Sequence, residues 1–110
     1  MSKFFESEVV QEELKIINRM QEEIYSTMLS FGSMEHEDQI EHIEKLTVLL
    51  DKQRVMYTRL SLSDDPQALE MKKHLEKSVQ LMGFPEGTDM NMIFSGMTKT
   101  IEKLKQVVDP

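Results

Sequence analysis

The 110-residue sequence contains no cysteine and no tryptophan. Without cysteine the chain can form neither a disulfide nor a thiolate metal site, and it has no cysteine nucleophile. No apolar run approaches the roughly 20 residues of a membrane-spanning helix, and the first residues, MSKFFESE, lack the apolar segment of a signal peptide. The missing cysteines fit a reducing cytoplasm, where disulfides rarely form.

Basic residues are also in short supply, since 13 Lys and Arg stand against 20 Asp and Glu and leave a net charge of −7. The net charge is −5 over residues 1–62, which hold 7 bases and 12 acids, and −2 over residues 63–110, which hold 6 bases and 8 acids. An acidic surface repels nucleic-acid phosphates and anionic lipids. We therefore expect neither a nucleic acid nor a membrane among the partners of this protein.

The sequence does have a clear helical periodicity. Apolar residues recur at helical spacing over residues 7–31, 34–60, 66–82 and 89–107, and no segment alternates with the period that marks a strand. Within the second of these segments, residues 40–60 carry an apolar arc of roughly 200°, about twice what a surface helix needs. That segment should therefore contact neighbours on two sides. The sequence predicts a single all-α domain over residues 1–110, a long antiparallel helical hairpin with two shorter helices packed on it, similar to a four-helix bundle.

Local signals mark where the predicted helices begin and end. Gly32 is expected to end the first helix in a left-handed conformation, and Ser33 to cap the second helix with its hydroxyl. The connection is then so short that the two helices must form an antiparallel hairpin. Asp65 is the expected N-cap of the third helix, with Pro66 at its first position.

Three further features bear on packing. Phe4 and Phe5 precede the first helix and are expected to fold back as a hydrophobic plug. Gly96, inside the last helix, is either a tolerated imperfection or a point of close backbone approach. The ten methionines are interpreted as core-filling side chains rather than as an adaptable binding surface. Six of them lie on apolar helical arcs: Met28, Met56, Met71, Met82, Met90 and Met97.

Four stretches in this order carry a resemblance: FFESEVVQEEL, LLDKQRVMYTRLSLSDDP, LMGFP and MIFSGMTKTIEKL. The chain resembles, over nearly its whole length, a family of short, uncharacterised helical proteins found in cyanobacteria and in the phages that infect them. The resemblance implies a cytoplasmic protein of photosynthetic bacteria or of their phages. It implies no activity, ligand or catalytic residue.

No motif of a known reaction is present. A di-iron carboxylate site in a helical bundle needs Glu-x-x-His pairs, but none of His36, His42 and His74 has a glutamate three residues before it. The glutamate pairs at 12–13 and 22–23 lack the third glutamate of the magnesium sites of all-helical nucleotide pyrophosphatases. The sequence also has no phosphate-binding glycine loop and no nucleophile elbow. We therefore expect no catalytic residue, no metal site and no cofactor.

Five polar residues lie within apolar helical arcs, where apolar residues are expected: Glu13, Gln21, His42, Gln53 and Arg54. One interpretation is structural, namely buried polar groups that satisfy one another or the edge of an interface. The other is a small polar pocket inside the bundle. If the hairpin turns near Ser33, Glu13 lies level with Gln53 and Arg54. We therefore expect the Glu13 carboxylate to hydrogen-bond one of these two residues.

The sequence favours a non-catalytic helical protein–protein interaction module of unknown partner. Several apolar residues lie outside the main helical faces: Leu29, Val48, Val55, Leu81 and Met92. Because a second copy of the chain could bury this surplus apolar surface, we expect a homo-oligomer. The alternative is a helical bundle that binds a small ligand or carries out catalysis through Glu13, Gln53 and Arg54.

Overall fold

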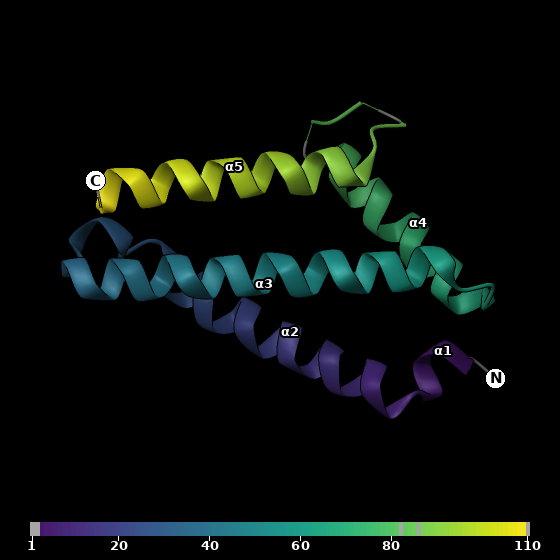
Figure 1. Ribbon diagram of the computed structural model, residues 1–110. Coiled ribbons are helices and arrows are strands. Elements are labelled where there is room, and N and C mark those ends of the chain that lie inside the picture. The colour runs from purple at the N-terminus through teal and green to yellow at the C-terminus, as the bar shows by residue number, and fades with distance from the viewer. Residues whose placement is uncertain (1–2, 82, 86, 110) are drawn as a thin grey trace.

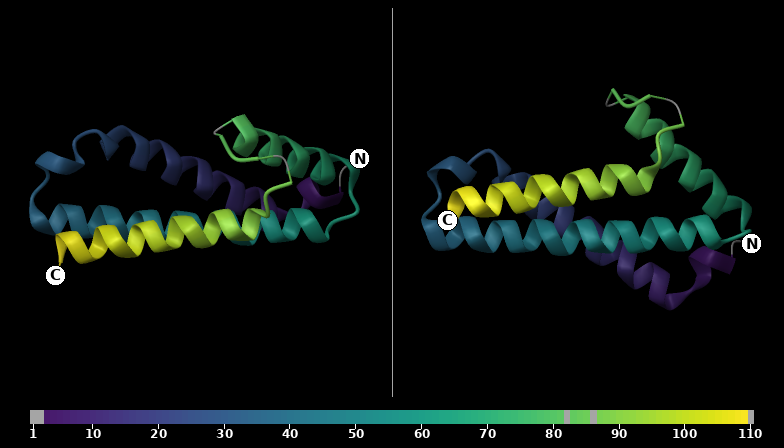
Figure 2. Two further views of the ribbon diagram at one scale, coloured as in Figure 1. Left: turned by 90° about the horizontal axis from the view of Figure 1, so that it is seen from above. Right: turned by 45° about the horizontal axis from the view of Figure 1, so that its top comes forward.

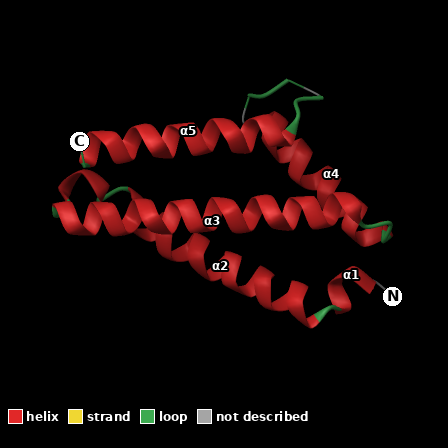
Figure 3. Cartoon of the chain, in the orientation of Figure 1, coloured by secondary structure: helices red, strands yellow, loops and turns green. Residues whose placement is uncertain are grey.

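The computed structural model describes residues 3–81, 83–85 and 87–109. This part of the chain forms helices α1 (Lys3–Glu6), α2 (Glu8–Met28), α3 (His36–Leu62), α4 (Pro66–Leu81) and α5 (Met90–Val108), and a 3₁₀ turn, η1 (Phe31–Ser33). It contains no strand, as Figure 3 shows. The predicted all-α, bundle-like fold is therefore confirmed.

Helix α3 runs through the centre of the molecule (Figure 1). Helix α5 runs antiparallel along it, so that the C-terminus lies near the first turns of α3, and α4 packs near the other end of α3 (Figures 1 and 2). Helix α2 precedes the hairpin turn and crosses α3 at an angle (Figure 2). Residues 40–60 thus contact helices on more than one side, as their wide apolar arc predicts.

Two apolar clusters form on different sides of α3. The larger one joins α2, α3 and α4 through buried side chains that include Ile24, Leu60 and Ala68, and Phe4 and Phe5 of α1 pack against it as the predicted plug. The smaller cluster joins α3 to α5: Leu50 with Met90, Ile93 and Phe94. Each cluster uses only part of the arc of α3, which explains why that arc is so wide.

Asp65 caps α4 and also holds the N-terminal segment in place. Its Oδ1 accepts a hydrogen bond from the Gln67 backbone N–H at 2.9 Å, and Pro66 is the first residue of α4, as predicted. Its Oδ2 accepts a second hydrogen bond, from the Phe4 backbone N–H at 2.8 Å. Asp65 as a whole is only 8% exposed. One side chain therefore links α4 to α1.

The predicted turn between the first two long helices is wrong in detail. Helix α2 ends at Met28, Gly32 does not adopt a positive φ, and Ser33 lies in η1, so that it does not cap α3. The N-cap of α3 is Glu35, whose side chain makes no capping hydrogen bond. The hydroxyls of Ser30 and Ser33 each donate to the backbone carbonyl three residues earlier, at 2.9 Å. Such local hydrogen bonds compete with the regular helix.

Two interpretations of packing are also settled within the described residues. A Cβ atom placed on Gly96 would meet no heavy atom within 4 Å, so this glycine marks no close backbone approach.

Among the methionines assigned to the core, Met56 and Met90 are buried, but Met28 and Met97 are 46% and 38% exposed. Met82, also assigned to the core, lies outside the described residues. Helical periodicity places a residue on a face, and only the neighbouring helices decide whether that face is covered.

The first prediction concerns the two contacts of Asp65. Replacing it with alanine removes a helix cap and leaves the Phe4 N–H without its acceptor, so Asp65→Ala should lower the free energy of unfolding by about 1–2 kcal/mol. The neighbouring Asp64 is exposed, and Asp64→Ala is the matched control with an expected change below about 0.5 kcal/mol. Urea unfolding followed by circular dichroism measures both. Equal stability of the two variants would contradict the role assigned to Asp65.

Candidate functional site

The structure separates the five polar residues predicted from the sequence. His42 is buried, Glu13, Gln21 and Gln53 are half-buried, and Arg54 is exposed. Gln21 and Gln53 line one and the same pocket, whereas Arg54 lines different ones. The set therefore does not form a single polar site, and Glu13, Gln53 and Arg54 are not brought together.

Glu13 pairs with a lysine that sequence reasoning did not consider. Its Oε2 lies 3.4 Å from Lys52 Nζ, while the Arg54 guanidinium contacts Asp51 of its own helix at 2.7 Å. The predicted contact of Glu13 with Arg54 or Gln53 is therefore wrong, although the register is correct to within one or two residues. Arg54 lies about 200° around the helix from Lys52, so it points away from α2.

A second ion pair joins α2 to α3 nearer the turn. Lys45 Nζ lies 2.6 Å from Glu23 Oε1. The hydrogen bond from Lys45 and its positive charge lower the pKa of Glu23. The hydrogen bond to Glu23 and its negative charge raise the pKa of Lys45. Both side chains are largely exposed, so this pair contributes little to stability.

His42 is a structural residue of the same hairpin. Its side chain is buried, its Nδ1 lies 3.4 Å from Thr27 Oγ1, and its ring lies 5.3 Å from the ring of Phe31. Burial, and to a smaller extent the charge of Lys45, lowers the pKa of His42 below 6.5. The imidazole is therefore neutral at pH 7 and supports the connection between α2 and α3.

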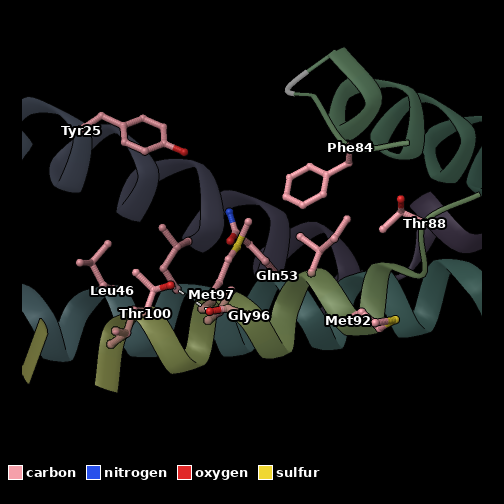
Figure 4. Close-up of a pocket in the computed structure, with 13 residues that line it drawn as sticks. Tyr25, Leu46, Gln53, Phe84, Thr88, Met92, Gly96, Met97 and Thr100 are labelled. Atoms are coloured by element: carbon pink, nitrogen blue, oxygen red, sulfur yellow. Dashed lines mark hydrogen bonds between the residues drawn. The ribbon is translucent and has the colours of Figure 1, made fainter. Parts of the chain in front are cut away.

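An open apolar groove of about 800 Å³ lies between α2 and α5 above α3, and we call it the α2–α5 groove. Its walls are mainly aliphatic and include Leu46, Leu49, Ile93 and Met97. Figure 4 shows Tyr25 of α2 at one end, Phe84 of the α4–α5 loop towards the other, and Gln53 with Met97 between them. The groove exists because α2 crosses α3 at an angle while α5 runs along it (Figure 2).

A smaller pocket of about 330 Å³ adjoins this groove and shares Gln53 and Met97 with it. Helices α2, α3, α4 and α5 all contribute to its lining. Three carboxamide side chains reach it, those of Asn18, Gln21 and Gln53, and we call it the carboxamide pocket. Sequence reasoning singled out Gln21 and Gln53 but missed Asn18, because Asn18 lies at the edge of the apolar arc of α2.

The side of α3 that faces away from the carboxamide pocket carries a row of exposed apolar residues. Val48, Val55 and Leu62 are 46%, 43% and 83% exposed and follow one another at intervals of seven residues. We call this row the outer face of α3. Sequence reasoning found the two valines but missed Leu62, because it ended the helix at Leu60.

Comparison with known proteins places the chain in a family. Residues 2–108 match the model of the family described as a domain of unknown function, DUF1825. The chain belongs to this family. Neither the search of curated proteins nor the search of solved structures finds a match to it. The family resemblance noted in the sequence is confirmed to the extent of a domain of unknown function that covers nearly the whole chain.

Within residues 3–81, 83–85 and 87–109, no three side chains of histidine, aspartate or glutamate come together in a way that could hold a metal ion. None of the helices in the same residues is both long and apolar enough to cross a membrane. The features that offer chemistry are therefore the α2–α5 groove, the carboxamide pocket and the outer face of α3.

The second prediction follows from the lowered pKa of His42. The unfolded chain binds a proton at this residue near pH 6.5 and the folded chain only at lower pH, so the stability that neutral His42 provides is present above pH 6.5 and is lost as pH falls below it. Between pH 7.5 and 5.5 the wild type should lose up to about 1.4 kcal/mol more stability than His42→Gln.

Urea unfolding at the two pH values measures this difference. The control is His74→Gln, which makes the same replacement at an exposed histidine of α4. If His42→Gln and the wild type lost the same free energy, His42 would not be the group that titrates.

Proposed function

We propose that this protein is a non-catalytic helical interaction module that self-associates through the outer face of α3. The observation that carries the proposal is the row of Val48, Val55 and Leu62 on the solvent side of the central helix. Apolar residues at intervals of seven lie on one face of a helix, where a second helix can cover them. Exposed apolar side chains in a row of this kind point to a protein interface.

The charges beside this row support a second copy of the chain as the occupant. The first half of the exposed side of α3 carries the acids Glu41 and Glu44 and the second half carries Arg59, while Asp51 and Arg54 pair with each other within the helix. Two copies of α3 that pack antiparallel about a two-fold axis place acidic halves against basic halves. The face is thus complementary to itself, as a two-fold dimer requires.

A definite register follows from this arrangement. With Val48 opposite Val55 of the partner subunit, Glu44 lies opposite Arg59 of the partner subunit. Symmetry repeats each contact, so that two valine layers are flanked by two ion pairs. Arg54, which sequence reasoning assigned either to a buried polar group or to the edge of an interface, lies at the edge of this one.

We further infer that the protein acts in the cytoplasm of a photosynthetic bacterium or of a cell infected by one of its phages. The resemblance of the sequence to the cyanobacterial and cyanophage family supports this origin. The lack of cysteine fits a reducing compartment.

The third prediction is that light scattering after size exclusion, at tens of micromolar, gives twice the chain mass of 12.9 kDa. Val48→Asp/Val55→Asp should give the single mass, because four carboxylates would be buried in the valine layers of the dimer. The control is Leu29→Asp, which introduces a carboxylate at a fully exposed leucine after α2 and should leave the mass unchanged.

Charge reversal tests the register within the same experiment. Glu44→Arg alone should weaken the dimer, because the new guanidinium faces Arg59 of the partner subunit, and Glu44→Arg/Arg59→Glu should restore it. Circular dichroism confirms that each variant is folded. A wild-type mass of 12.9 kDa would overturn the proposal, and a double charge variant no better than the single one would overturn the register.

A further inference from the structure

The carboxamide pocket has polar groups that the fold itself does not use. Asn18 and Gln21 reach it from α2 and Gln53 from α3. None of these three side chains hydrogen-bonds another group in the described part of the chain. Each offers one carbonyl acceptor and one NH₂ donor. Asn18 is exposed, and Gln21 and Gln53 are half-buried. A bound molecule that their carboxamides reach could therefore hydrogen-bond them at no cost to the protein's own hydrogen bonds.

The walls of the pocket select against charge. No charged side chain of the described residues lines it. Tyr57 lines the pocket and donates its hydroxyl hydrogen bond to Glu76 Oε1 at 2.9 Å. The Glu76 carboxylate therefore already accepts a hydrogen bond from the protein. Bringing an ion into such a site costs several kcal/mol unless an opposite charge pairs with it. The pocket therefore favours an uncharged ligand.

The same walls indicate the size and shape of the ligand. A volume of about 330 Å³ is at the lower end of the range for small-molecule sites, about 300–1,000 Å³. Four methionines line the pocket, Met56, Met71, Met90 and Met97, together with the ring of Phe94. Methionine adapts to irregular shapes and makes favourable contacts with aromatic rings. These walls suit a flat molecule of one or two rings.

We propose that the carboxamide pocket binds an uncharged, planar molecule of one or two rings whose edge carries an N–H beside a carbonyl, as in a lactam. A carboxamide pairs with such an edge through two parallel hydrogen bonds, one donated in each direction. The methionines and Phe94 cover the faces of the rings. The α2–α5 groove, which shares Gln53 and Met97 with the pocket, is the route of entry.

This site lies on the opposite side of α3 from the proposed dimer interface. Gln53 is about 140° around the helix from Val48. The ligand site therefore goes beyond the proposed function and does not depend on it. Val48→Asp/Val55→Asp, which should be monomeric, should bind the ligand as the wild type does.

Two bicyclic probes of the same shape test the proposal. 2-Quinolone carries a lactam edge, and naphthalene has none. NMR spectra of the protein labelled with ¹³C at the methionine methyl groups report binding directly, because four of the ten methionines line the pocket. 2-Quinolone should shift the methyl signals of Met56, Met71, Met90 and Met97 and leave that of Met28 in place. It should bind at least tenfold more tightly than naphthalene.

Variants separate the role of the carboxamides from that of the walls. Gln21→Met/Gln53→Met keeps the side-chain size but removes both amides, and it should abolish the preference for 2-quinolone. The matched control is Gln80→Met/Gln106→Met, which changes two exposed glutamines outside the pocket and should keep the preference. Thermal melting confirms that both variants are folded, and Gln53→Met alone replaces the double variant if that one unfolds.

Three outcomes would overturn the proposal. The first is that 2-quinolone shifts no methionine signal from the pocket. The second is that both probes bind equally to the wild type, which would show that the carboxamides do not recognise the ligand. The third is that the control pair of glutamines loses the preference as well. A monomeric wild type would overturn the dimer and leave this result standing, so the two proposals can fail separately.

Discussion

The fold depends on the burial of two apolar sides of a single helix. Helix α3 carries apolar side chains over so wide an arc that no single neighbour can cover them. Helices α2 and α4 cover one part of the arc and α5 covers another, with Ile24, Leu60 and Ala68 on one side and Phe94 on the other. The remaining helices are arranged around α3 because each supplies a partial cover for it, and burial of apolar surface is the main force that favours the folded state.

This arrangement also creates the two candidate sites. Because α5 lies along α3 while α2 crosses it, α2 and α5 diverge and leave the α2–α5 groove and the carboxamide pocket between them (Figures 2 and 4). The opposite side of α3 is left without a covering helix, and there Val48, Val55 and Leu62 meet solvent. The ligand site and the dimer interface are thus two consequences of the same central helix, on different sides of it.

Features that depend on a few neighbouring residues could be read from the sequence. Asp65 and Pro66 begin α4 as predicted, because a carboxylate acceptor followed by a residue with a fixed φ specifies a helix start locally. The same local reasoning failed at Gly32 and Ser33. There the hydroxyls of Ser30 and Ser33 bond to nearby carbonyls and form a 3₁₀ turn, an alternative that the sequence offers equally well.

The sequence by itself determined the four long helices and the central place of residues 40–60, because apolar periodicity sets these directly. Tertiary structure alone decided which side chains meet. The register differs from the predicted one by one or two residues, so Glu13 pairs with Lys52. Arg54 lies two residues further along α3, about 200° around the helix axis, and pairs with Asp51 instead. The angle at which α2 crosses α3 then brought Asn18, Gln21 and Gln53 to one pocket. That angle depends on how whole helix faces pack, which no local pattern encodes.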